Sequence, residues 1–378
     1  MKHPCLKVLI LILIAIPIGF FALLKHLECN PIFMGGGPSY RPEHCTAKQR
    51  AQEKENNMQK IQQLAALEFS CVHEVRPEIS QELQRLYDYA LYLDLHKMWT
   101  GKEGDWNMLL PYYRIAAANG DYKANLRLQY LLESNRVITK HAYEEVHSLN
   151  KTLAKQLPAT AYYKLYGHLD IGFGVTTKEK DGKYAYLRKA ADLGSREAQY
   201  VVADMVGDID VTDDESIQFI RKLRKQLLIC SSEQGLGIAS EFLGIRYQAE
   251  KEYKKALLTF HQGVKNGNQQ SASRLRYAFK AENIESHGYL GLMPDLERAT
   301  RYEMINSYLF KYDYLQPKVP DLDEIVPLPP AKLPPWDGKI AFQRWFEGPP
   351  PEKPSDELMQ KLAEKVGLDW QTGLPLKK

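Results

Sequence analysis

The sequence predicts an all-α fold, an α-solenoid built from stacked helical hairpins. A Gly followed four or five residues later by a small residue recurs along the chain, at Gly120 with Ala124, Gly194 with Ala198, Gly235 with Ala239, and Gly267 with Ser271 and Ala272. Leu157 with Ala161 keeps the spacing halfway between the first two glycines, which gives two steps of 37 residues, followed by steps of 41 and 32. Such periods have the length of two helices and two turns. Each unit is therefore expected to end a helix at Gly, which tolerates the left-handed conformation, and to restart where two helices meet closely.

The composition is that of a globular protein without a dominant charge. The 378 residues are 44% apolar and 26% charged, which is typical of a folded chain. Because 50 basic residues face 47 acidic ones, no broad positive field is present to attract nucleic acid. We expect no nucleic-acid partner.

Residues 1–29 are predicted to form an N-terminal membrane anchor. An uncharged run from about residue 8 to residue 24 would cover roughly 26 Å as a helix, at the short end of a bilayer span. Lys2 and Lys7 precede it, so the positive-inside rule places the amino terminus in the cytoplasm and the body on the other side. A cleaved signal peptide is the alternative, but no small-x-small cleavage site follows the run, which favours an anchor.

Residues 30–78 are predicted to be a linker and a helix, with cysteines on either side of that helix. Cys29, Cys45, Cys71 and Cys230 follow the predicted membrane-spanning run and allow three full pairings. We expect Cys45 to pair with Cys71, which would close a loop worth about 3 kcal/mol in the chain-entropy model. A zinc site made of His44, Cys45, Cys71 and His73 is the alternative, but the spacing is not that of structural zinc sites. We expect no metal.

Residues 79–314 are predicted to be the repeat domain. A strongly amphipathic segment at 79–99 pairs with a second helix through Leu109 and Tyr113, for which Asp105 is the expected N-cap and Gly120 the stop. Five further pairs follow, at 124–134 with 142–156, 161–169 with 183–193, 198–206 with 215–234, 239–248 with 252–265, and 272–281 with 296–310. Such hairpins bury their apolar faces only against neighbours, so we expect one continuous array.

Residues 315–378 are predicted to be a Pro-rich extended tail with a short helix at 356–366. Dense proline at 326–335 disfavours helix, and Asp337-Gly338 predicts a turn into a short strand. Because Trp336 and Trp345 lie beside the proline run, packing of the tail onto the repeats as a cap is favoured over a free docking peptide.

The repeats resemble a known family. Residues 161–175, with Gly172-Phe-Gly174-Val175, lead to 186–198, with Ala190-Ala191 before Gly194 and Ala198, and this stretch resembles the Sel1-like repeat, a TPR-like helical hairpin. Residues 242–267 look like another copy without the Gly-x-Gly-Val turn, and 116–120 like a partial third. The resemblance covers roughly residues 80 to 285. It implies the fold and a role in protein–protein interaction, and it does not specify an activity.

A second resemblance concerns the whole arrangement. A membrane-targeted segment, divergent Sel1-like units and the element Leu333-Pro-Pro-Trp-Asp-Gly338 look like bacterial envelope proteins encoded beside type VI secretion effectors, including immunity proteins for phospholipase D-type lipases. This resemblance implies a single-pass protein of the bacterial inner membrane with its body in the periplasm. It also implies a secreted lipase effector as the partner, which the protein would bind and neutralise.

Catalytic templates do not match the chain. None of the ten histidines begins the His-x-Lys element of a phospholipase D, no Gly-x-Ser-x-Gly elbow occurs, and Gly172-Phe-Gly174 and Gly235-Leu-Gly237 are lone Gly-x-Gly pairs. We therefore expect no enzymatic activity, no catalytic or cofactor-binding residues and no cofactor. The alternative to an immunity protein is a Sel1-like scaffold or regulator of an envelope protein complex.

Overall fold

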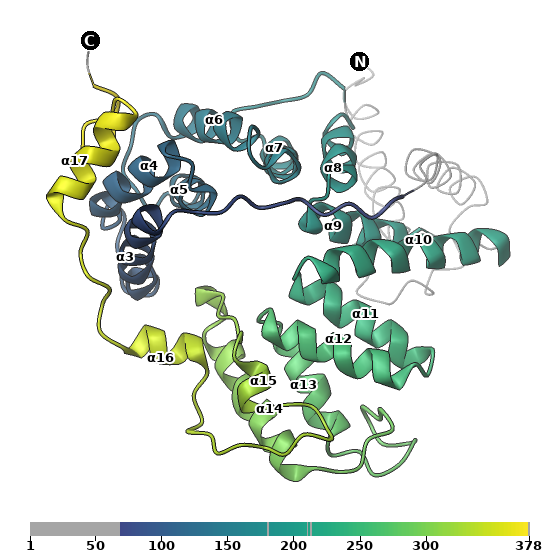
Figure 1. Ribbon diagram of the computed structural model, residues 1–378. Helices are drawn as coiled ribbons and strands as arrows, with labels where there is room; N and C mark the ends of the chain where they lie inside the picture. The colour runs from purple at the N-terminus through teal and green to yellow at the C-terminus, as the bar shows by residue number, and fades with distance from the viewer. Residues whose placement is uncertain (1–68, 180, 210, 212–213, 377–378) are drawn as a thin grey trace, which may run out of the picture. The chain divides into compact units, whose positions relative to one another are not determined.

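The computed structural model describes residues 69–376 except 180, 210, 212 and 213 (Figure 1). The described helices belong to one compact unit that spans residues 68–208 and 212–378. They are α3 (Gln81–Lys97), η1 (Asn107–Leu109), α4 (Leu110–Ala118), α5 (Tyr122–Glu133), α6 (Ala142–Leu153), α7 (Pro158–Ile171), α8 (Lys183–Asp192), α9 (Arg196–Gly207), α10 (Asp214–Glu233), α11 (Gly237–Ala249), α12 (Tyr253–Lys265), α13 (Gln269–Ala278), α14 (Leu296–Lys311), η2 (Asp313–Leu315), α15 (Leu322–Ile325), α16 (Ala341–Glu347) and α17 (Asp356–Lys365).

The predicted all-α hairpin fold is confirmed for the described residues. Every helix from α3 to α14 packs against the next one along the chain (Figure 1). The only β pairing among these residues is an isolated bridge between Leu368 and Pro375. Consecutive helices thus bury one another, as the repeat pattern predicts.

The Gly-to-small-residue register matches the turns between hairpins. Gly120, Gly194, Gly235 and Gly267 all have positive φ, between 84° and 104°, and Ala124, Ala198, Ala239 and Ala272 are fully buried. In three of the four turns the residue after the Gly caps the next helix with its side chain, namely Asp121, Ser195 and Asn268. A left-handed Gly followed by an N-cap turns the chain within two residues.

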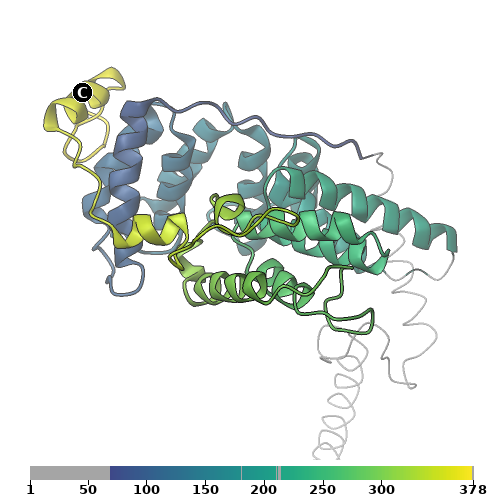
Figure 2. The same ribbon diagram turned by 60° about the horizontal axis from the view of Figure 1, so that its bottom comes forward.

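The C-terminal tail contributes to hydrophobic cores at both ends of the array. Leu362 and its neighbours on α17 pack among the buried residues of α3 to α5, which include Trp106 and Tyr113. Leu322 and Ile325 of α15 join the buried residues of α12 to α14. Figure 2 shows the tail running from α15 through α16 to α17, which lies beside the first helices. The tail therefore packs back onto the repeats.

Two arginines of α14 hold the proline-rich part of the tail. The guanidinium of Arg298 donates to the carbonyl oxygens of Pro327 and Ala331, and that of Arg301 donates to those of Ile325 and Pro334, both at 2.7 Å. Proline residues lack an N–H and cannot form a backbone ladder. Arginine side chains therefore satisfy carbonyl groups that a helix or sheet would otherwise pair.

An extended segment, residues 69–79, precedes α3, and we call it the N-terminal strap. Figure 1 shows it passing α7, α8 and α9 to reach α10. The Val72 carbonyl accepts a hydrogen bond from Gln199 at 2.9 Å, and the Glu74 carboxylate accepts one from the backbone N–H of Ala159 at 2.7 Å. The strap thus links helices of two successive hairpins, α7–α8 and α9–α10.

A disulfide joins the strap to α10. Cys71 is bonded to Cys230, with 5.5 Å between their Cα atoms. The predicted pairing of Cys45 with Cys71 is therefore wrong. The prediction weighed nearness in sequence, whereas the fold brings together two cysteines that are 159 residues apart.

Two local predictions are also wrong. The expected strand after Asp337-Gly338 is the helix α16, and its first N–H, that of Ala341, donates to Asp321 at 2.9 Å. Asp105 does not cap α4, because the turn η1 intervenes and the Asp105 carboxylate accepts from the N–H of Lys102 instead.

The predicted location, a single pass through the bacterial inner membrane with the body in the periplasm, is contradicted. Among the described residues, no helix combines the length and apolar character that crossing a membrane requires. The segment for which the anchor was predicted, about residues 8–24, lies outside the described residues, as does the helix predicted at 46–70 up to residue 68.

Candidate functional site

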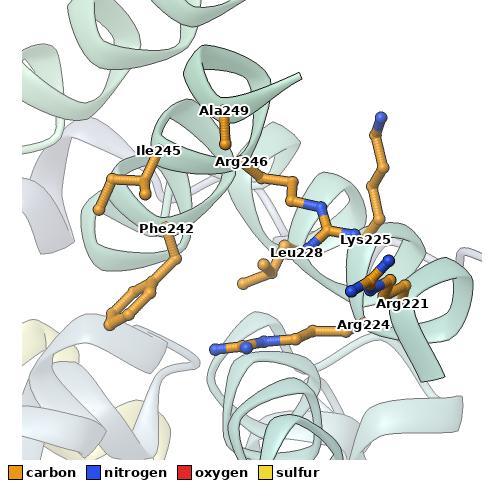
Figure 3. A pocket seen from close by; sticks show the side chains of 8 residues that line it. All are labelled: Arg221, Arg224, Lys225, Leu228, Phe242, Ile245, Arg246 and Ala249. Carbon is orange, nitrogen blue, oxygen red and sulfur yellow. The ribbon is translucent and has the colours of Figure 1, made fainter. Parts of the chain in front are cut away.

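The most chemically distinctive surface feature of the described chain is a small pocket between α10 and α11 (Figure 3). Each helix contributes four residues at positions i, i+3, i+4 and i+7, which lie on one helix face. The pocket has a volume of about 200 Å³ and is lined by Arg221, Arg224, Lys225 and Leu228 of α10 and by Phe242, Ile245, Arg246 and Ala249 of α11. We call this the α10–α11 pocket.

The lining of the α10–α11 pocket has a cationic and an apolar part. In Figure 3, Arg221, Lys225 and Arg246 gather on one side, whereas Phe242 and Ile245 lie on the other. The guanidinium of Arg224 reaches towards Phe242 (Figure 3). The Phe242 ring contacts the ring of Tyr200 on α9, with 6.0 Å between the ring centroids. Positive charge and apolar surface therefore lie side by side.

Two of the four cations are neutralised within the protein. Glu250 accepts from Lys225 at 2.5 Å and from Arg246 at 2.9 Å, and Glu252 lies 3.7 Å from Lys225. The hydrogen bond from Lys225, together with Arg246, lowers the pKa of Glu250 below its ordinary value. One carboxylate thus bridges the two cations at the rim.

The other two cations, Arg221 and Arg224, form no ion pair within the described part of the chain. The Nε atom of Arg224 is buried and has no hydrogen-bond partner. Gly207 of α9 makes room for this guanidinium, because a Cβ atom there would lie 2.6 Å from the Arg224 Cζ atom. The Nε–H is covered at this contact, and the part of Arg224 that an acceptor can reach is the part that lines the pocket.

A second polar cluster lies near the C-terminal end of the array, where His261 and Tyr302 are buried and the Asp323 side chain is exposed. His261 of α12 is 5% exposed, and its two ring nitrogens contact the Tyr302 hydroxyl at 2.8 Å and the Asp323 carboxylate at 2.7 Å. Burial lowers the pKa of His261. The cluster joins α12, α14 and α15 and has the character of a structural joint, since Tyr302 is fully buried.

The cysteine and histidine residues considered for zinc are placed differently from the prediction. Cys71, His73 and Cys230 come together, with ligand atoms within 4.8 Å of one another, while His44 and Cys45 lie outside the described residues. Because the two sulfur atoms are bonded to each other, neither is a thiolate, the form that binds metal. That no metal or cofactor is bound stays a prediction.

Sequence reasoning assigned no site residues and missed the α10–α11 pocket. The signal was present in the run Arg221-Lys-Leu-Arg-Lys225, which places three cations on one helix face. The overall net charge of +3 obscured it. The other half of the pocket lies on α11, and only folding brings it next to the cations of α10.

Comparison with protein families gives a match for the C-terminal part of the chain. A family model described as a domain of unknown function, DUF6396, matches residues 271–376, which run from α13 through the tail. No curated protein matches the chain.

Three solved structures resemble it. Immunity protein PA5088 from Pseudomonas aeruginosa has a TM-score of 0.50 at 20% identity, covering 69% of this chain and 94% of that one. Immunity protein Pa5087 from the same organism has a TM-score of 0.45 at 21% identity, and the match covers 70% of this chain and 95% of that one. A Sel1 repeat protein from Oxalobacter formigenes has a TM-score of 0.38 at 20% identity, and the match covers 67% of this chain and 96% of that one. The likeness to PA5088 confirms the predicted resemblance at the level of fold.

Proposed function

We propose that this chain is an immunity protein, which binds a toxic effector protein and neutralises it by binding alone. The observation that carries the proposal is the fold shared with PA5088, which is described as an immunity protein. Fold alone does not determine function, so the site must be compatible as well. Arginine and aromatic side chains, which line the α10–α11 pocket, are enriched where protein interfaces gain most of their energy.

The proposed partner is an effector of type VI secretion, of the phospholipase D type. This finer assignment rests on the sequence resemblance described above, which includes the element Leu333 to Gly338. That element serves the fold of this chain, because the Trp336 indole N–H donates to the Lys339 carbonyl at 2.6 Å and the ring lies under Arg301. It supports a relationship, and we do not propose it as the contact surface.

The test combines binding with neutralisation. The full chain is co-expressed with the effector encoded beside its gene, and the two are co-purified and assayed for lipase activity and for toxicity to cells. We expect a stable complex, loss of lipase activity and rescue of growth. A phospholipase D from an unrelated source is the control and should be neither bound nor inhibited. A chain that neither binds nor neutralises the neighbouring effector would show that the proposal is wrong.

A further inference from the structure

The two unpaired arginines of the α10–α11 pocket are preorganised to receive an anion. Arg221 and Arg224 are one helical turn apart on α10, both line the pocket, and neither forms an ion pair within the described part of the chain. A guanidinium is always charged and offers donors in a planar fork, which matches a carboxylate with two parallel hydrogen bonds. The chain shows this two-bond recognition elsewhere, where Arg114 donates to both oxygens of Glu145 at 2.7 and 2.8 Å.

The size of the pocket selects among anions. About 200 Å³ is below the 300–1,000 Å³ that sites for small molecules and cofactors usually have. One side chain of a partner protein fits this volume. The apolar part formed by Phe242, Ile245 and Leu228 offers nothing to a free inorganic ion, but it suits the aliphatic stem of a Glu or an apolar residue next to it.

We propose that the α10–α11 pocket is the docking point for an acidic segment of the partner protein. An Asp or Glu carboxylate of that segment binds Arg221 and Arg224, and an adjacent apolar side chain packs against Phe242 and Ile245. This assignment rests on the proposed function, since the segment belongs to the effector. It goes beyond that function by naming the surface and the charge of the partner.

The first experiment measures binding of the effector to pocket variants of the full chain. Arg221→Gln with Arg224→Gln removes both free cations, and we expect the Kd to rise at least 10-fold. Lys222→Gln is the matched control, because Lys222 is exposed on the same helix and does not line the pocket. Its Kd should stay within about 2-fold of the wild type. Thermal melts establish that each variant is folded.

A charge swap adds a reciprocal test. Arg224→Glu should abolish tight binding, and an effector in which the contacting Asp or Glu is changed to Arg should restore it. If the wild-type chain binds the effector and the double Gln variant binds equally well, the assignment of the pocket is overturned while the immunity function stands. If the wild-type chain does not bind the effector, the proposed function fails, and the pocket is then judged on a peptide probe.

The peptide probe is a fluorescent Glu-rich peptide that contains one Leu, with inorganic phosphate as a competitor. We expect the peptide to bind the wild type and Lys222→Gln, and to lose binding at least 10-fold with the double Gln variant and progressively with added salt. Equal binding to all variants, or no binding to the wild type, overturns the proposal. Displacement of the peptide by phosphate at constant ionic strength also overturns the proposal, because the pocket would then be a phosphate site.

Discussion

At the scale of single residues, Asp94 is the most heavily used polar group of the first hairpins. Its carboxylate is fully buried and accepts hydrogen bonds from the Trp106 indole at 2.8 Å, the Tyr113 hydroxyl at 2.9 Å and the Arg127 guanidinium at 2.6 and 2.9 Å. Neutralising it would leave the Arg127 charge without its partner. Asp94→Asn should lower the free energy of unfolding by about 3–5 kcal/mol, the cost of breaking a buried ion pair, as measured by urea denaturation.

Asp88 supplies the control for this prediction. It lies on the same helix, is partly exposed, and its carboxylate accepts from Gln84 at 2.5 Å. Asp88→Asn should cost less than about 1 kcal/mol, because the Asn side-chain oxygen can still accept from Gln84 and the site is partly solvated. Equal losses for the two variants would contradict the role given to the Asp94 network.

The buried His261 makes stability depend on pH. Burial lowers the pKa of His261 below its ordinary value of 6.5, so between those two values the unfolded chain binds the proton and the folded chain does not. The stability that neutral His261 contributes is therefore present above about pH 6.5 and is lost as the pH falls towards the lowered pKa. His261→Gln should melt below the wild type at pH 7.5, with a gap that narrows by pH 5. A gap that stays constant across this range would show that His261 does not titrate on unfolding.

The partner of His261 titrates in a lower range. Burial alone would raise the pKa of Asp323, but hydrogen bonds from Lys265 and His261 outweigh burial and hold it below 3.8. Its contribution is present above its ordinary pKa and is lost only as the pH falls through the lowered value. The range in which Asp323 titrates therefore lies below pH 5, so the change between pH 7.5 and 5 reports on His261.

At the scale of elements, the turn at Gly194 combines a left-handed backbone with a close approach of the strap. Gly194 has φ +104°, and a Cβ atom there would lie 2.7 Å from the backbone nitrogen of Glu74. Gly120 has φ +103°, but its Cβ would meet only the flexible end of Gln156 at 3.1 Å. Gly194→Ala should therefore be more destabilising than Gly120→Ala, by about 1–3 kcal/mol for the added overpacking.

Gly194→Ala and Gly120→Ala together separate backbone strain from packing against the strap. Backbone strain is shared, because both φ values are nearly the same, so the difference in the free energy of unfolding reports the strap contact alone. If Gly120→Ala costs as much as Gly194→Ala, strain rather than packing limits both turns. The repeat register in the sequence predicted the left-handed backbone at these glycines, but nothing in the sequence indicated the contact with the strap.

The same division between local and distant causes explains which elements were predictable. The helices of the repeats follow from periodicity and from Gly stops, and their observed bounds, such as α12 at Tyr253–Lys265, agree with the expected ones to within a few residues. Helix α16 was missed because Asp321, 20 residues earlier in the chain, supplies the acceptor for its first N–H. The α10–α11 pocket was missed for the same reason, since its two halves meet only after folding.

At the scale of the whole described chain, the tail and the strap tie together parts that are distant in sequence. The Tyr92 hydroxyl of α3 donates to the Gly348 carbonyl at 2.7 Å, and Asn119 after α4 donates to the Leu362 carbonyl at 2.9 Å. Both contacts span more than 240 residues. A repeat array ordinarily consists of near-neighbour contacts, so these links add long-range cooperativity. Sequence periodicity cannot reveal them.

The Cys71–Cys230 disulfide also joins parts of the chain that are distant in sequence, and it does so covalently. Cross-linking cysteines 159 residues apart removes loop entropy from the unfolded chain worth up to about 5 kcal/mol in the chain-entropy model. Cys71→Ser, at an exposed position, should therefore melt well below the wild type under non-reducing conditions. Reductant should lower the melting temperature of the wild type to about that of the variant and leave the variant unchanged.

Cys45→Ser distinguishes this disulfide from the pairing that nearness in sequence favours. Because Cys71 is bonded to Cys230, Cys45→Ser should leave this disulfide intact and keep the sensitivity of the melting temperature to reductant. Mass spectrometry of a non-reduced digest should find the peptides of Cys71 and Cys230 joined in both proteins. If Cys45→Ser loses as much stability as Cys71→Ser, the strap is not locked to α10 by this bond, and the hydrogen bonds of Val72 and Glu74 alone hold it across the hairpins.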